Sequence, residues 1–186
     1  MCTLCVCASV LADVTVKLDP QKTGAPISKY LYGHELFRNS DLFYMANYAQ
    51  TVNVLGCIKV TNTAADMATT ALPLELYHRH FGTIPIAVSG ATGNLDFSAA
   101  WTKDKTAVTV AIVNPDPQDQ PVKVDLGGLN VKEKAKRWLV GSANPESDNE
   151  PGQPPNVVIQ REKADIENST LLAPRYSIAM YRLEVR

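Results

Sequence analysis

The sequence predicts a mainly β protein, an antiparallel β-sandwich or jelly roll with one or two helices in its N-terminal half. From about residue 84 onward, short runs of alternating apolar and polar residues are separated by turns rich in Gly, Pro, Asn and Asp. Helical spacing is confined to the stretch from His34 to Gly82. A chain of 186 residues that is 45% hydrophobic and 20% charged can bury one core. We therefore expect a single β-sandwich domain over residues 13–186.

Charge and hydropathy argue against two classes of partner. The 18 Lys and Arg residues nearly balance the 19 Asp and Glu residues, and no block of like charges stands out. This balance gives no electrostatic basis for binding nucleic acid or a membrane surface. No stretch is long and apolar enough to span a bilayer. We expect neither nucleic acid nor a membrane as a partner.

Residues 1–12, MCTLCVCASVLA, are apolar and end with the small-residue spacing that a signal peptidase accepts. No Lys or Arg precedes the apolar run, so it looks like a shortened signal peptide, with a buried first strand as the alternative. This remnant indicates a secreted or periplasmic ancestry. Cys2, Cys5 and Cys7 predict no metal site, because the only other cysteine is Cys57 and no second cluster of ligands exists.

The first elements expected along the chain are a strand and a helix. Residues 13–19, DVTVKLD, alternate apolar and polar side chains as a half-buried strand does. A helix is expected at about residues 40–55, because apolar side chains from Leu42 to Val52 share one helical face. An Asn-Ser-Asp sequence supplies N-cap chemistry before it, and Gly56 ends it.

A second helix is expected at about residues 70–80. Pro73 falls in its first turn, where proline is tolerated, and Gly82 lies just past its end. The remainder of the chain reads as strands, about nine in all with the first, which is near the eight of a jelly roll. These expected strands cover residues 84–88, 95–101, 108–112, 122–126, 135–140, 157–161, 169–173 and 177–185.

Two long segments carry a resemblance to a known family. RNSDLFYMANYAQTVNVLG (residues 38–56) and ATTALPLELYHRHFGTIPI (residues 68–86) resemble the passage from the last barrel helix to the C-terminal β-domain in α-L-arabinofuranosidases of glycoside hydrolase family 51. The NPDPQ turn and the closing strand SIAMYRLEVR share this likeness. ISKYLYGH (residues 27–34) resembles the family's passage from an N-terminal strand of the β-domain into the first barrel strand. The resemblance implies a β-domain built from both ends of the family's chain.

The resemblance also implies that the catalytic (β/α)8 barrel is missing, since His34 runs directly into a segment like the last barrel helix. The family's two catalytic glutamates lie in that barrel, and their sequence contexts do not occur here. The family's reaction needs two carboxyl groups about 5 Å apart, one protonated and one ionised. The candidates for a replacement pair are Glu35, Glu146 and Glu150. The last two lie in the loop of residues 141–156, whose simpler interpretation is a solvated surface loop.

Four other residues invite functional interpretations that the pattern disfavours. Trp101 and Trp138 each fall in an expected strand, where an inward aromatic side chain is commoner than a sugar-stacking platform. His78 and His80 are two residues apart and do not share a helical face, so they do not form a metal-binding pair. No nucleotide-binding or nucleophile-elbow motif occurs, and we expect no cofactor.

Two functions remain open. In the first, the chain is an arabinofuranosidase-family protein reduced to its C-terminal β-sandwich, an accessory domain that meets arabinose- or xylose-containing glycans of the arabinoxylan type and is not catalytic by itself. In the second, it is a minimal glycoside hydrolase on arabinofuranosides or xylosides that uses a carboxylate pair foreign to the family. The helix from Leu42 to Val52 would also lack the barrel that covers it in the family, which predicts a homo-oligomer through that helix.

Overall fold

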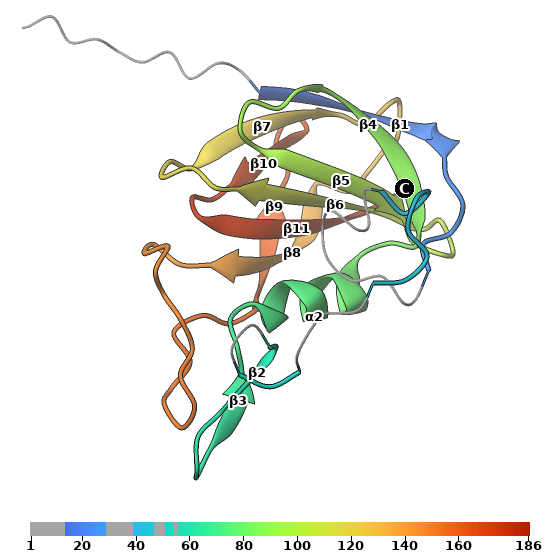
Figure 1. Ribbon diagram of the computed structural model, residues 1–186. Helices are drawn as coiled ribbons and strands as arrows, with labels where there is room; N and C mark the ends of the chain where they lie inside the picture. Colours follow the sequence, from blue (N-terminus) through green and yellow to red (C-terminus); the bar gives the residue numbers. More distant parts are fainter. Residues whose placement is uncertain (1–13, 29–38, 47–50, 54–55) are drawn as a thin grey trace, which may run out of the picture.

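The computed structural model shows one curled nine-stranded sheet, a separate two-stranded hairpin and one helix within the residues that it describes (Figure 1). Two stretches that matter to the sequence predictions lie outside those residues. They are the expected signal segment at the N-terminus and the segment that contains His34 and Glu35. The residues described are 14–28, 39–46, 51–53 and 56–186.

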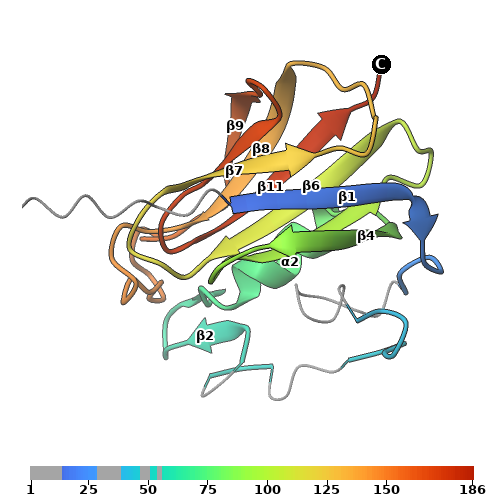
Figure 2. The ribbon, with the colours of Figure 1, turned by 90° about the horizontal axis from the view of Figure 1, so that it is seen from above.

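The strands of the large sheet follow the order β10-β7-β1-β4-β5-β6-β11-β8-β9. Neighbouring strands run antiparallel except β1 and β7, which are parallel, so the sheet is mixed. The strand nearest the N-terminus thus lies inside the sheet, with β7 on one side and β4 on the other (Figure 2). The strands are β1 (Val14–Thr23), β4 (Ile84–Ala91), β5 (Asp96–Trp101), β6 (Ala107–Asn114), β7 (Gln120–Asp125), β8 (Lys134–Gly141), β9 (Gln160–Asp165), β10 (Thr170–Ala173) and β11 (Ser177–Glu184).

The sheet curls so far that its two edge strands, β9 and β10, are joined by the short connection of residues 166–169. Apolar side chains fill the space inside the curl. On β1, for example, Val16 and Leu18 are buried while Lys17 between them is exposed. The Tyr181 hydroxyl on β11 donates a hydrogen bond of 2.6 Å to the Leu172 carbonyl on β10, although these strands are not neighbours in the sheet. One main core therefore lies inside the curl.

A second, smaller core lies outside the curl, under the helix α2 (Ala71–His80). The buried helix residues Leu72, Leu76 and Tyr77 pack with Trp138 on β8 and Met180 on β11. In both ribbon views the helix lies between the sheet and the β2–β3 hairpin (Figures 1 and 2). The helix is thus the layer that covers the outer face of β6, β11 and β8.

Immediately after α2, the backbone passes very close to β5 and β6. The Gly82 N–H donates to the Thr109 hydroxyl (2.8 Å), and that hydroxyl donates to the Ala100 carbonyl (3.1 Å). The Thr83 N–H donates to the Trp101 carbonyl (2.9 Å). A Cβ atom on Gly82 would lie 2.5 Å from the Trp101 carbonyl oxygen and 2.8 Å from that of Ala100. Glycine is required here because the approach leaves no room for a side chain.

The mainly β fold class and the second helix are confirmed. The helix expected at about residues 70–80 is α2, which begins and ends within a residue of the prediction. Each predicted strand from residue 84 onward has a counterpart in the sheet. No helix in the described part of the chain has the length and apolar character needed to cross a membrane.

The helix expected at about residues 40–55 is wrong for the part of it that the structure describes. Residues 39–46 and 51–53 form turns, bends and an isolated bridge between Val52 and Ile58. The apolar side chains that suggested a helical face are exposed, Leu42 by 74% and Met45 by 51%. Short helices in water depend on packing of their apolar face, and this face has no covering surface among the described residues.

One strand prediction also needs correction, and one hairpin was missed. The strand expected over residues 157–161 begins only at Gln160, because the backbone of Val157 is bonded in both directions to the Asn149 side chain (2.8 and 2.9 Å) and its own side chain is buried in the core under α2. The hairpin of β2 (Ile58–Val60) and β3 (Ala65–Met67) was not predicted, because three-residue strands are too short to establish an alternating pattern.

The close approach at Gly82 predicts that Gly82→Ala lowers the free energy of unfolding by about 3 kcal/mol, since the new Cβ meets rigid backbone oxygens that cannot move aside. Urea unfolding followed by circular dichroism measures the change. Gly24→Ala is the matched control, because a Cβ there would make only ordinary contact with Pro85, at 3.5 Å. Equal stabilities of the two variants would contradict the argument.

Candidate functional site

The acidic loop between β8 and β9, residues 142–159, is bound to the β2–β3 hairpin. Lys59 on β2 forms ion pairs with Asp148 and with Glu150, the latter over 3.0 Å between Nζ and Oε1. The Thr69 hydroxyl, just before α2, donates to the other Asp148 oxygen (2.8 Å). One ammonium group thus holds two carboxylates of the loop.

Backbone hydrogen bonds hold the same loop in place. The Gly152 N–H donates to Oδ2 of Asp66 on β3 (2.8 Å), and the Asn149 N–H donates to the Thr69 hydroxyl (3.0 Å). The Asn149 side chain is buried and pairs with the Val157 backbone, as described above. The loop is therefore part of the packed structure, and its carboxylates Asp148 and Glu150 have defined partners.

The electrostatics of this cluster favour charged side chains. Hydrogen bonds to Asp148 and then to Glu150 raise the pKa of Lys59, and the hydrogen bond from Lys59, followed by that from Thr69, lowers the pKa of Asp148. A general acid in glycoside hydrolysis needs the opposite, a carboxyl group that stays protonated near neutral pH. The cluster is accordingly arranged as an ion pair.

The structure places two of the three predicted catalytic candidates. The Glu150 side chain, with its ion pair to Lys59, is mostly exposed. Glu146 is exposed, and its backbone N–H donates to Oδ1 of Asn144 (3.1 Å). Glu35 lies outside the described residues. The structure brings Asp148, which was not a candidate, next to Glu150, and the catalytic assignment of Glu35, Glu146 and Glu150 stays a prediction.

Both tryptophans belong to the cores, as the sequence pattern favoured. Trp101 and Trp138 are each 7% exposed. The Trp101 Nε1–H donates to the Pro20 carbonyl (3.1 Å), and the Trp138 ring is stacked by His80 at a centroid distance of 4.3 Å. Neither ring presents a face on which a sugar could stack.

The histidines of α2 occupy different environments. His78 is exposed, whereas His80 is half-buried against Trp138. Burial, then the charges of Arg79 and Arg161, lower the pKa of His80, and Glu75 acts in the opposite direction. Within the described residues, no three His, Cys, Asp or Glu side chains are grouped so that they could hold a metal ion.

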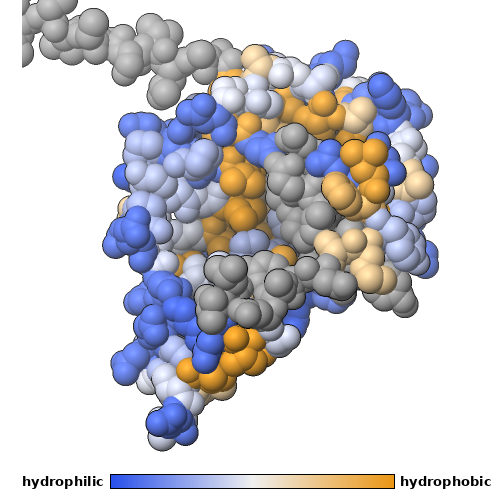
Figure 3. Space-filling view, viewed as in Figure 1, coloured by the Kyte–Doolittle hydropathy of each residue, from blue (hydrophilic) through white to orange (hydrophobic). Residues whose placement is uncertain are grey.

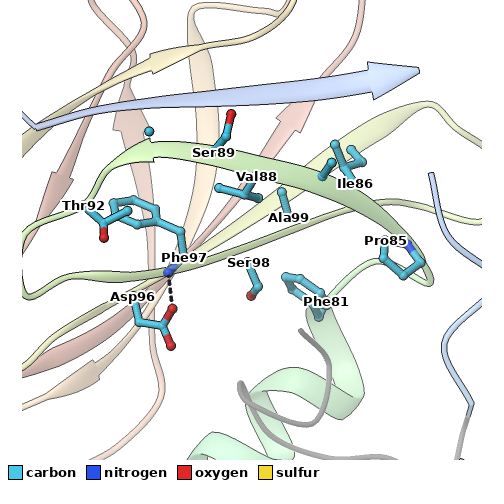
Figure 4. A pocket seen from close by; sticks show the side chains of 12 residues that line it. Phe81, Pro85, Ile86, Val88, Ser89, Thr92, Asp96, Phe97, Ser98 and Ala99 are labelled. Atoms are coloured by element: carbon cyan, nitrogen blue, oxygen red, sulfur yellow. Dashed lines mark hydrogen bonds between the residues drawn. The ribbon is translucent and has the colours of Figure 1, made fainter. Parts of the chain in front are cut away.

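One opening lies where β4 and β5 separate. The two strands pair only from Ile84 to Ile86, and beyond that point they diverge around a hollow of about 380 Å³. Figure 4 shows Asp96, Ser98 and Phe81 on the side of the sheet that faces α2. The Asp96 carboxylate accepts a hydrogen bond from the Phe97 N–H (2.9 Å). This hollow has a mixed lining and no group of side chains arranged for chemistry.

A larger groove of about 470 Å³ lies at the start of α2, and we call it the α2 groove. Four segments surround it, namely the start of α2, the β6–β7 turn, the end of β8 with the loop that follows, and the β10–β11 turn. Its lining is neutral throughout. The lining residues are Thr69, Thr70, Pro73, Val113, Asn114, Pro115, Val140, Gly141, Ser142, Asn144, Pro145, Ser147, Val157, Tyr176, Ser177 and Ile178.

The sequence prediction missed this groove because its residues come from four distant segments. In the structure, Tyr176 at this groove has a φ of 47°, in the left-handed region, and the sequence pattern does not indicate this conformation. A bulky residue rarely adopts this conformation, and such positions occur often at functional sites. The groove is therefore the second candidate site, beside the acidic loop.

The chain matches a family model and solved structures. The model described as the α-L-arabinofuranosidase C-terminal domain matches residues 30–177. No curated protein sequence matches the chain. Three of the similar solved structures are arabinofuranosidases, two of which are described as members of glycoside hydrolase family 51.

The structural likeness covers most of this chain and a minor part of each enzyme. The thermostable enzyme from Thermotoga petrophila RKU-1 is 21% identical, with a TM-score of 0.71 over 81% of this chain and 36% of the enzyme. The enzyme from Xanthomonas axonopodis pv. citri is 23% identical, with a TM-score of 0.68 over 80% of this chain and 33% of the enzyme. The arabinose complex of the Thermotoga maritima enzyme is 22% identical, with a TM-score of 0.67 over 79% of this chain and 35% of the enzyme. The chain thus spans about a third of the length of these enzymes, and the likeness establishes a shared fold.

The environment of His80 predicts lower stability in acid. The folded protein holds His80 with a lowered pKa, so below about pH 6.5, the ordinary value for histidine, the unfolded chain binds more protons and the free energy of unfolding falls. We expect His80→Gln to remove this part of the pH dependence. Urea unfolding between pH 5.5 and about 7.5 measures it.

The control for this experiment is His78→Gln, because His78 lies on the same helix and is exposed. This variant should keep the pH dependence of the wild type. If the stability of His80→Gln falls with pH as steeply as that of the wild type, the interpretation is wrong.

Proposed function

The chain belongs to the family of α-L-arabinofuranosidase C-terminal domains, and from that membership we propose that it is an accessory β-domain of arabinose-polysaccharide breakdown that is not catalytic by itself. The proposal rests on how much of each enzyme this chain covers. The chain spans about a third of solved family 51 arabinofuranosidases, and its described residues form the β-domain. By the resemblance described above, the catalytic glutamates of the family belong to the barrel.

The geometry of the acidic loop supports a non-catalytic assignment. The reaction of retaining glycosidases needs one carboxyl group with a raised pKa beside an ionised nucleophile. Asp148 and Glu150 instead share the Lys59 ammonium, which lowers the pKa of Asp148. Two charged carboxylates on one cation can bind the loop to the hairpin, but they lack a proton donor.

A minimal glycoside hydrolase is the second candidate, and one observation favours it. A hollow of about 370 Å³ lies between the hairpin and the acidic loop, and Asp148 and Glu150 both line it. A sugar that displaced Lys59 from these carboxylates would meet two acids in one place. This function would need Glu150 together with Glu146, Asp148 or Glu35.

The first candidate predicts no hydrolysis of p-nitrophenyl α-L-arabinofuranoside or β-D-xyloside above the buffer rate by highly purified protein, because the ion pair with Lys59 favours the charged form of Asp148 and so opposes a role as proton donor. The variants Glu35→Gln, Glu146→Gln and Glu150→Gln should give the same rate as the wild type. Turnover that copurifies with the protein and falls at least about 100-fold in one of these variants would contradict the accessory assignment and establish the hydrolase.

We further propose that the chain forms a homo-oligomer through the segment from Leu42 to Val52. The support is exposed apolar surface. Leu42, Tyr44 and Met45 are 74%, 70% and 51% exposed. Figure 3 shows a further apolar area over the β2–β3 hairpin at the lower end of the molecule, where Val60 and Met67 are exposed. Apolar side chains gathered in this way mark contact surfaces.

The oligomer is tested by sedimentation velocity at tens of micromolar protein. We expect a dimer or larger species for the wild type and a monomer for the double variant Leu42→Asp, Met45→Asp, since a buried aspartate pair would oppose the contact. Leu172→Asp, an exposed position on the edge strand β10, is the control and should sediment like the wild type. A monomeric wild type would refute the proposal.

A further inference from the structure

The α2 groove has a rigid frame. Asn114 is buried in its wall and uses all of its side-chain groups, donating to the carbonyls of Gln118 (2.9 Å) and Ala173 (2.8 Å) and accepting from the Asp116 N–H (2.9 Å). These bonds join the β6–β7 turn to the β10–β11 turn. The Arg175 N–H, which donates to Oδ1 of Asp119 (2.9 Å), joins the same two turns. The groove is therefore formed before any ligand arrives.

The floor of the groove depends on one close backbone approach. A Cβ atom on Gly141, at the end of β8, would lie 2.6 Å from the Ser177 Cβ and 2.7 Å from the Tyr176 carbonyl oxygen. The Tyr176 N–H donates to the Asp116 carbonyl (3.2 Å), which holds Tyr176 at its positive φ. The surrounding turns thus fix an aromatic residue at the groove in a conformation that costs free energy.

Three polar side-chain groups at the groove have no hydrogen-bond partner among the described residues. They are the Thr70 hydroxyl, the Asn144 amide nitrogen and the Tyr176 hydroxyl. Apolar side chains of Val113, Val140 and Ile178 line the same groove. No lining residue carries a charge. The groove therefore offers hydrogen bonds and apolar contact to a neutral ligand and nothing that would balance an ionic one.

We propose that the α2 groove binds a neutral saccharide, with Tyr176 as the aromatic surface for one sugar ring. A sugar ring has hydroxyl groups around its edge and C–H groups on its faces, which match the open polar groups and the apolar floor. The volume lies within the range of about 300–1,000 Å³ that is usual for small-molecule sites. The choice of a neutral sugar as the ligand class is argued from the lining of the groove alone. The choice of a pentose, arabinose or xylose, rests on the proposed function.

The test is a titration of the full, isotope-labelled chain with xylotriose and with L-arabinose, up to 50 mM, followed by NMR. We expect shift changes at the amides of Thr70, Asn144 and Ser177, with a millimolar dissociation constant for xylotriose. Tyr176→Ala should raise that constant about tenfold, a loss of about 1.4 kcal/mol, and Tyr176→Phe should stay within about threefold of the wild type. Unchanged binding by Tyr176→Ala overturns the proposal.

Matched variants separate binding from folding. Thr70→Val removes a hydroxyl that makes no capping hydrogen bond, so the fold is retained and binding should weaken several-fold. Tyr44→Ala truncates an exposed aromatic residue that does not line the groove and should bind like the wild type. Shift changes confined to other surfaces, or none at 50 mM, overturn the groove assignment. Sodium phosphate should cause no change at these amides, and tighter binding of phosphate than of sugar would overturn the neutral class.

This experiment and the hydrolysis assay fail independently. Absence of sugar binding removes the groove assignment and leaves the non-catalytic assignment intact. Hydrolysis that responds to a glutamate substitution removes the accessory assignment. The binding constant of Tyr176→Ala still shows whether the α2 groove binds the sugar.

Discussion

The large sheet depends on the position of β1. This strand lies between β7 and β4 and is hydrogen-bonded on both sides, so without it β10 and β7 would be cut off from the other strands. Its apolar residues Val16 and Leu18 are buried inside the curl and are part of the main core. The segment nearest the N-terminus is therefore as necessary to the domain as any later strand. A family member that keeps its C-terminal strands can form this sheet only if it keeps β1 as well.

Small residues decide how the second layer is placed. β6 is buried on both faces, with Val110 inside the curl and Ala111 under α2. Because Ala111 is short and Gly82 has no side chain, the end of the helix and the chain after it lie directly on the strands. This contact brings the start of α2 to the end of β8 and the start of β11, where the α2 groove lies. The helix is thus structural at its middle and lines a candidate site at its first turn.

Local patterns predicted the parts of the fold that are local in origin. The alternation through Val16 and Leu18 and the flanking signals of Pro73 and Gly82 each reflect burial or chain geometry at neighbouring positions. The predicted helix at residues 40–55 was wrong where it can be compared, because a helical face needs a covering surface that periodicity does not reveal. The parallel pairing of β1 with β7 was not predicted either, since no local signal specifies which distant strand is a neighbour. The α2 groove was missed for the same reason, as Thr70, Asn144 and Tyr176 meet only in the folded chain.

The placement of β1 also has a consequence for biosynthesis. Val14 pairs with Val122, so the ribosome must add 108 residues (122 − 14) after the first of these before their hydrogen bonds can form. At a synthesis rate of about 5–20 residues per second, this takes on the order of 5–20 s. During that interval β1 can pair with β4 but not with β7, so one of its edges stays unpaired, and an unpaired strand edge is a template for aggregation. The nascent chain therefore needs a temporary cover for that edge of β1, such as a chaperone, until β7 has been synthesised.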